Sequence, residues 1–166
     1  ALRGNVADAA AHASTALAAY CPLATRIFGS PRIGLWLKKI FMNSIVLSTL
    51  LFNSQVRVLE PASVEKLNAV YMRVLRRISG NVNFGHSELS DLQVRRDLGS
   101  PSLDCLIQRK RLMYLQRAGS SSHTSLLALL GWRTHEGTKL PWVQLVTSDL
   151  EFLYERVQQV RDVLPN

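Results

Sequence analysis

The residues of this sequence best suited to chemistry are clusters of arginine and lysine near the ends of predicted helices. They are Arg73, Arg76 and Arg77, then Arg95 and Arg96, then Arg109, Lys110 and Arg111. Such cations neutralise phosphates, which gives a salt-sensitive, sequence-independent affinity for a nucleic-acid backbone. If the helices pack as a bundle, the clusters could converge on one rim. The alternative is a set of solvated surfaces, because helix C-termini favour cations in any case.

No pattern that would support catalysis accompanies these cations. The histidines are scattered, at His12, His86, His123 and His135. The sequence contains neither HExxH nor a phosphate-binding glycine loop. Two-metal nucleotidyl transfer needs clustered carboxylates, whereas the acidic residues here are dispersed. The sequence therefore predicts a chain that is not an enzyme and that uses no cofactor or metal. Cys21 and Cys105 lie far apart and are predicted to be buried thiols.

Charge is distributed unevenly along the 166 residues. The first 117 residues carry 16 Lys and Arg against seven Asp and Glu, and the remaining residues carry four against five. We therefore expect an anionic partner for the first part, either nucleic acid (RNA or an RNA–DNA duplex) or another acidic surface. Other protein subunits are expected to contact the second part. The most apolar run, residues 40–52, is shorter than the roughly 20 residues that cross a membrane, so we expect a core helix and no transmembrane segment.

All the elements that position the cations are predicted to be helices. The clearest is 64–77, whose apolar residues repeat every three to four positions and define one face. Those residues are Val64, Leu67, Tyr71, Val74 and Ile78. Ser30-Pro31 and Ser100-Pro101 have the form of helix starts. Further helices are predicted at about 6–20, 31–58, 87–98, 101–118 and 123–130. The fold class is therefore all-α, a compact bundle of about six to seven helices.

The last predicted helix begins at Pro141 and carries a heptad-like seam. Its positions are Val146, Leu150, Leu153, Val157 and Val160. The seam spans fewer than three repeats, which is too short for an independent coiled coil. We expect it to dock onto the body of the chain or onto a partner helix. Two domains are accordingly predicted: a basic helical bundle over 1–118, and a linker with a C-terminal amphipathic docking helix over 119–166.

Two stretches of the sequence resemble a known family. They are LKKIFMNSIVLSTLLFNSQVRVLEPASVEKLNAVYMRVLRRISG (37–80) and SELSDLQVRRDLGSPSLDCLIQRKRLMYLQRAG (87–119). They resemble the thumb and linker that follow the palm in reverse transcriptases of non-LTR (LINE-like) retrotransposons. The resemblance covers about residues 5–118, and more loosely 124–155. It implies a helical module that grips the template–primer duplex. By position, it implies backbone contacts for Lys38, Lys39, Arg73, Arg76, Arg77, Arg109, Lys110 and Arg111.

The sequence departs from that family in lacking the palm with its Tyr-x-Asp-Asp motif, an endonuclease and a Cys/His finger. The chain could therefore not polymerise DNA by itself. Because it begins without Met, we expect a processed protein or a fragment of a longer one. Two functions stay open: a non-catalytic module that binds a nucleic-acid backbone, and a structural or accessory subunit of a larger assembly, such as an organellar one. The compartment would be nuclear for an unmodified retroelement protein and organellar for such a subunit.

Overall fold

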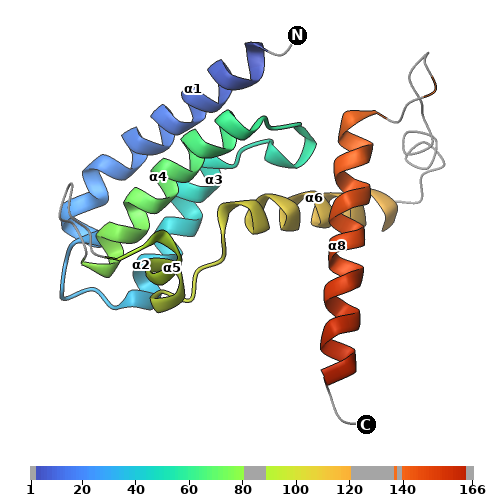
Figure 1. Cartoon of the computed structure of the whole chain (residues 1–166). Coiled ribbons are helices and arrows are strands. Elements are labelled where there is room, and N and C mark those ends of the chain that lie inside the picture. The colour runs from blue at the N-terminus through green and yellow to red at the C-terminus, as the bar shows by residue number, and fades with distance from the viewer. Residues whose placement is uncertain (1–2, 81–88, 121–136, 138–139, 164–166) are drawn as a thin grey trace. The chain divides into compact units, whose positions relative to one another are not determined.

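The computed structural model describes residues 3–80, 89–120, 137 and 140–163, and these residues form helices and turns but no strand (Figure 1). The prediction of an all-α fold is confirmed. The predicted helix at 123–130 and Ser87, the predicted cap of the helix at 87–98, lie outside the described residues. Within the described part, the helical residues form six continuous runs beside a 3₁₀ turn, η4 (Ser54–Val56). The runs are 3–28, 35–50, 61–79, 91–97, 103–120 and 141–163.

The chain divides into two compact units. Unit 1 comprises residues 1–52 and 59–106, and unit 2 comprises residues 53–58 and 107–166. Helix α6 (Leu103–Ser120) therefore contributes residues to both units. The domain boundary expected after residue 118 is a different division, and it stays a prediction.

Unit 1 is built on α1 (Arg3–Tyr20) and α4 (Pro61–Ser79), which pack along each other and run in the same direction (Figure 1). Ala9 and Ala16 are buried on α1, and such small side chains let neighbouring helices approach closely. Beyond Tyr20 the chain continues through η1 (Cys21–Leu23) into a π-helical turn, η2 (Ala24–Phe28), which packs on α4. The C-terminal ends of α1 and α4 therefore lie at the same edge of unit 1.

The apolar face predicted for α4 faces the core. Of its five residues, Val64 is half-buried and the others are buried, namely Leu67, Tyr71, Val74 and Ile78. The helix ends where Gly80 takes the left-handed conformation at φ 81°, which glycine adopts without a Cβ clash. The Tyr71 hydroxyl donates to the Pro101 carbonyl at 2.8 Å, which fastens the segment before α6 to α4.

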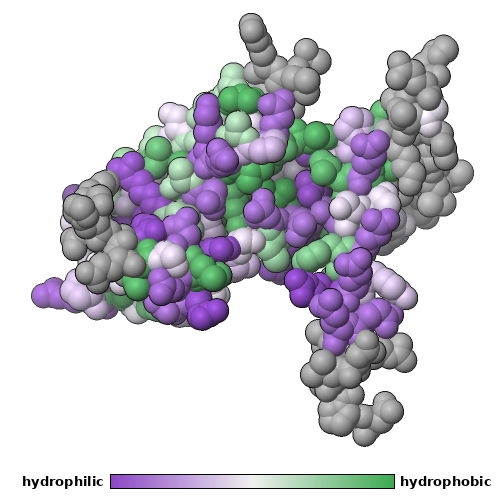
Figure 2. Space-filling view, viewed as in Figure 1, coloured by the Kyte–Doolittle hydropathy of each residue, from purple (hydrophilic) through white to green (hydrophobic). Residues whose placement is uncertain are grey.

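The predicted core helix at 31–58 is shorter and less buried than expected. It consists of α2 (Leu35–Phe41), the π-helical η3 (Met42–Leu47) and α3 (Ser48–Leu50). It ends before Asn53, whose left-handed φ of 57° turns the chain. Its first half is largely uncovered: Trp36 is 75% exposed, and Leu37 and Ile40 are also exposed, whereas Lys38 is the buried residue of this turn. Figure 2 shows hydrophobic residues scattered among hydrophilic ones on the visible face of unit 1.

The three helix starts that were predicted from serine or Ser-Pro signals lie later in the chain than predicted. Helix α2 begins after Gly34 and not at Pro31, because the Ser30 hydroxyl accepts from the Arg32 amide (3.3 Å) and holds a turn. Helix α6 begins at Leu103, where the Ser102 hydroxyl accepts from the Cys105 amide. Helix α5 (Asp91–Asp97) begins after a capping box formed by Ser90 and Gln93.

The cysteines also differ from their prediction, because Cys21 and Cys105 are both exposed. The first follows directly on α1, and the second lies in the first turn of α6. The buried positions beside Cys105 in α6 belong to Leu103 and Ile107, so the thiol falls on the outer side of that turn.

In unit 2, α8 (Pro141–Val163) crosses the second half of α6 (Figure 1). The buried residues among those described in this unit are Ser54 of η4, Ile107 and Arg111 of α6, and Val143, Val146 and Asp149 of α8. The Trp142 indole N–H donates to the Gln55 carbonyl at 2.8 Å, and the Trp142 ring meets Tyr114 edge to face with centroids 6.3 Å apart. These contacts tie segment 53–58 to the two helices.

Candidate nucleic-acid interface

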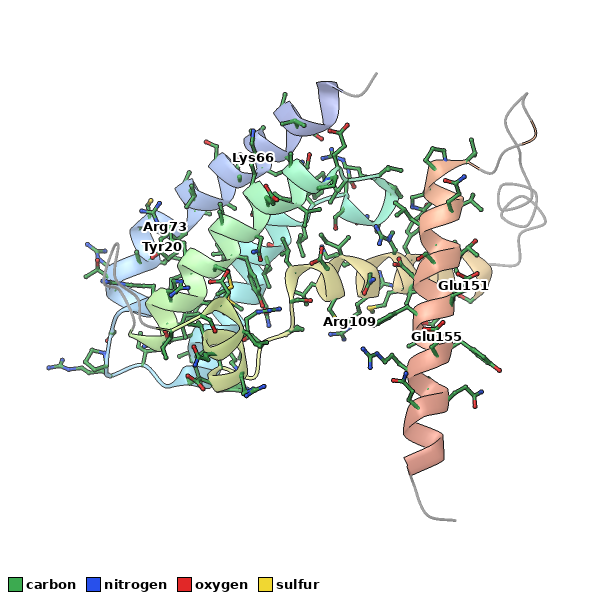
Figure 3. All side chains as sticks on the ribbon, in the orientation of Figure 1. Tyr20, Lys66, Arg73, Arg109, Glu151 and Glu155 are labelled. Atoms are coloured by element: carbon green, nitrogen blue, oxygen red, sulfur yellow. The ribbon has the colours of Figure 1, made fainter. Side chains whose placement is uncertain are left out.

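The exposed side of α4 carries cations at one-turn and two-turn spacings. Lys66 and Arg73 are both exposed, and Arg77 follows one turn later as a half-buried residue. Figure 3 places Arg73 beside Tyr20, with Lys66 farther back along α4. Lys66 was not among the residues predicted to contact nucleic acid. A sequence signal for it existed, because residues seven positions apart, such as Lys66 and Arg73, lie on the same side of a helix.

Arg77 is held in place from two directions. Its Nε donates to the Ala24 carbonyl in η2 at 3.0 Å. Its guanidinium lies against Gly29, where a Cβ would stand only 2.7 Å from Nη2 and 2.9 Å from Cζ. The sequence offers no periodic signal for this contact, because Gly29 and Arg77 are 48 positions apart and one of them is in a loop.

Arg73 and Arg77 both act on the hydroxyl of Tyr20. Burial raises the pKa of Tyr20 above its ordinary value of 10.0, while the positive charges of Arg77 and Arg73 act in the opposite direction. The Tyr20 ring is buried and stacks on Phe28, with centroids 5.7 Å apart. Arg73 and Arg77 therefore lie near the hydroxyl of a buried, stacked tyrosine, at the C-terminal ends of α1 and α4.

Asp91 binds one cation from each of the first two clusters, Arg76 through its carboxylate and Arg95 through its backbone carbonyl. Arg76 Nη2 contacts Asp91 Oδ1 at 2.6 Å, and Arg76 Nη1 donates to the Leu89 carbonyl at 3.2 Å. Arg95 is half-buried and its Nε donates to the Asp91 carbonyl at 3.4 Å, whereas Arg96 is exposed. Arg76 and Arg95 thus meet at Asp91, which leaves Arg96 as the more accessible cation of α5.

Arg95 also lines an open groove of about 230 Å³ in which acidic side chains predominate. The ionisable residues along this groove are Glu65, Asp91, Arg95 and Asp104. A phosphate would meet more negative than positive charge there, so the groove is a poor place for a nucleic-acid backbone.

Lys38 and Lys39 make contacts within unit 1. Lys38 is buried, with 8% of its surface exposed. The Lys39 ammonium donates to the Leu98 carbonyl, at the end of α5, where a cation satisfies a free helix carbonyl. Backbone contacts by these two lysines stay a prediction from the family resemblance, and their placement gives it no support.

The Arg109, Lys110 and Arg111 run of α6 does not form one patch, because consecutive residues of a helix point in different directions. Arg109 is exposed (Figure 3). Lys110 is half-buried, and burial lowers its pKa below the ordinary 10.5. Arg111 is buried in a bidentate pair with Asp149, with Nε–Oδ2 and Nη2–Oδ1 distances of 2.6 and 3.1 Å. Of the three, Arg109 is the cation best placed to reach a ligand.

The predicted docking seam of α8 changes character along its length. Val146 is buried, whereas Leu150, Leu153 and Val157 are exposed by 44, 47 and 54%. The side chain of Val160 lies outside the described residues. The exposed residues continue the spacing of Val143 and Val146, so the stripe that packs on α6 at one end is uncovered at the other.

Comparisons of the chain with protein-family models, curated proteins and solved structures give no match. Among the described helices, none is long and apolar enough to cross a membrane. The same residues contain no group of three or more His, Cys, Asp or Glu placed to hold a metal ion.

Proposed function

We propose that unit 1 binds the phosphate backbone of a nucleic acid, as a non-catalytic module related to the thumb and linker of non-LTR reverse transcriptases. The observation that carries the proposal is the pair Arg73 and Arg77 on successive turns at the end of α4, beside the end of α1. Arginine in such a position meets phosphate oxygens with several N–H donors. Lys66 and Arg96 are further exposed cations of the same unit.

The proposal assigns no chemical step to the chain. Its proposed ligand is a duplex backbone, since the contacts would be made by side chains along an exposed helix and not by stacking on exposed rings. Contacts to the phosphate backbone depend on the spacing of the charges and the shape of the grooves, so we expect the affinity to depend little on base sequence. Among duplexes, an RNA–DNA hybrid or RNA duplex is the expected partner because of the family resemblance.

The test is fluorescence anisotropy with labelled 20-base-pair duplexes of RNA, RNA–DNA hybrid and DNA between 50 and 300 mM NaCl. Three phosphate contacts to the DNA duplex would give a slope of log affinity against log salt of about −2.7, since each contributes about 0.9. Replacing Arg73 and Arg77 together by Ala should reduce the magnitude of this slope by at least about 0.9. The matched control is Arg156→Ala, which removes an exposed arginine of α8 in unit 2. Absence of binding at 50 mM NaCl would overturn the proposal.

A second function, docking of another protein subunit, rests on the uncovered half of α8. We propose that its occupant is an amphipathic helix with an apolar stripe and a flanking carboxylate. The stripe at Leu150, Leu153 and Val157 continues an already packed seam. Arg156 lies beside it, with its guanidinium 5.2 Å from the centroid of Phe152. A carboxylate on the partner helix would meet that cation at the rim.

Two synthetic helical peptides with the same leucine heptads, flanked by Glu in one and by Lys in the other, test this docking. The Glu peptide should bind more tightly, and Leu153→Glu should abolish its binding, while the control Glu155→Gln should not. Light scattering of the chain alone provides the counter-test, because a dimer that Leu153→Glu dissociates would assign the stripe to a second copy. Equal binding of the two peptides would also contradict the proposed partner.

A further inference from the structure

The contact between Gly29 and Arg77 carries an inference about the same surface. Gly29 has φ −88°, so its backbone conformation is open to any residue and does not itself require glycine. The atoms that a Cβ would strike are instead the Nε, Cζ and Nη2 of Arg77, at 2.7–2.9 Å. The Arg77 guanidinium can therefore occupy this position only because residue 29 has no side chain.

The guanidinium that rests on Gly29 is also fixed in rotation. Its Nε donates to the Ala24 carbonyl, 3.0 Å away, so this bond uses none of the N–H groups of the two terminal nitrogens. Holding a long cationic side chain in one geometry normally costs conformational entropy on binding. Here the fold has already fixed Arg77, so a ligand would meet a preorganised donor edge.

Arg73 supplies the second cation, one helical turn before Arg77. Residues four apart on a helix have Cβ atoms roughly 5–6 Å apart, and both side chains lie close enough to influence the hydroxyl of Tyr20. Tyr20 and Phe28, which are buried and stacked on each other, lie at the same edge of unit 1. Two arginines one helical turn apart are close enough for both to reach one tetrahedral anion.

We infer that Arg73 and Arg77 form a seat for a single backbone phosphodiester, and that Gly29 and Ala24 position Arg77 within it. This inference rests on the proposed nucleic-acid binding and makes it specific: one phosphate of the strand is held at the joined ends of α1 and α4. Gly29 is a positioning residue, since it makes no contact with the ligand itself.

The decisive variant is Gly29→Ala, which keeps every charge and displaces the Arg77 guanidinium. Its matched control is Gly34→Ala, because a Cβ at Gly34 has no neighbour within 4 Å among the described residues and φ there is −63°. The measurement is binding of the labelled 20-base-pair DNA duplex across the same salt series, with circular dichroism melting to verify that each variant is folded. One purely electrostatic phosphate contact, with no effect at 1 M salt, raises the affinity about eightfold at 100 mM NaCl. Losing that contact should therefore lower the affinity at 100 mM NaCl by about the same factor.

We expect Gly29→Ala to lower affinity at 100 mM NaCl by up to about eightfold, approaching the value for Arg77→Ala, while Gly34→Ala binds as the native chain does. We expect the double variant Arg73→Ala, Arg77→Ala to lose about 0.9 from the slope, which is the value for one phosphate, and not about 1.8. If the native chain binds but folded Gly29→Ala binds equally well, or the double variant loses about 1.8, the single seat is refuted and the proposed function stands. If the native chain does not bind, both are refuted.

Discussion

The buried pair of Arg111 and Asp149 yields the sharpest prediction about stability. The two side chains are 9 and 4% exposed, and their closest N–O distance is 2.6 Å. Asp149→Leu would leave the Arg111 guanidinium buried without its carboxylate. Removing one member of a buried pair costs about 3–5 kcal/mol, because the remaining charge keeps its desolvation penalty.

This loss is large relative to what a small unit can tolerate. Unit 2 comprises 6 residues of segment 53–58 and 60 residues from position 107 onward, and folded proteins have roughly 0.05–0.15 kcal/mol of stability per residue. A unit of that size would have about 3–10 kcal/mol in total. Asp149→Leu should therefore detach α8 from α6 in much of the population.

Urea unfolding followed by circular dichroism, together with hydrogen exchange of the α8 amides, would measure the effect. The double variant Arg111→Met, Asp149→Leu should recover most of the loss, since an apolar pair of similar volume is often neutral or stabilising by about 1–4 kcal/mol. The exposed Glu151→Gln, two positions along α8, is the control and should change stability by less than about 0.5 kcal/mol. A loss below about 1 kcal/mol for Asp149→Leu, or a double variant less stable than the single, would refute the reasoning.

Three further predictions concern unit 1 and the exposed end of α8. Burial raises the pKa of Tyr71 above 10.0, so the folded state keeps this proton to higher pH than the unfolded state does. The contribution of Tyr71 to the free energy of unfolding should be complete below about pH 10 and should be lost as the pH rises through the folded pKa. Urea midpoints at pH 8 and pH 11 should therefore differ less in Tyr71→Phe than in the native chain. Ser90→Ala removes the hydroxyl that accepts from the Gln93 amide and should cost about 0.5–2 kcal/mol by urea unfolding; no change would mean that the capping box does not hold α5. Leu75→Ala, at a position with 0% exposure, should cost about 2–5 kcal/mol, whereas Leu153→Ala, 47% exposed, should cost less than about 0.5 kcal/mol; similar melting shifts for the two would contradict the assigned burial.

Local periodicity predicted the elements whose packing depends on their own sequence. Helix α4 is the best case: the apolar spacing that predicted a helix at 64–77 lies within the observed helix, which begins three residues earlier, at Pro61. The Ser-Pro pairs were less reliable guides, because Ser30 could use its hydroxyl to hold a turn before the helix began. Similarly, nothing in the local sequence marks the π-helical turns η2 and η3, which depend on packing against neighbouring helices.

The candidate site was less accessible to sequence reasoning, because counting cations does not show what each one contacts. Arg111 looked like the last member of a basic run, yet its partner is 38 residues away. One local signal existed: Arg111 lies four residues after the apolar Ile107, on the same side of α6. Likewise, the effect of Gly29 on Arg77 depends on a tertiary contact that no spacing predicts.

The hydrogen bond from Trp142 to the Gln55 carbonyl has a consequence for the order of folding. The two residues are 87 positions apart, so at a synthesis rate of about 5–20 residues per second Gln55 leaves the ribosome about 4–17 s before Trp142. The remainder of unit 1 is synthesised within that interval, since the unit ends at residue 106. Segment 53–58 must therefore wait as a loop on a unit that has already had time to form. A nascent chain stalled once residue 106 has emerged from the ribosome, but before Trp142 has, should protect α4 from proteolysis while leaving this loop open to cleavage.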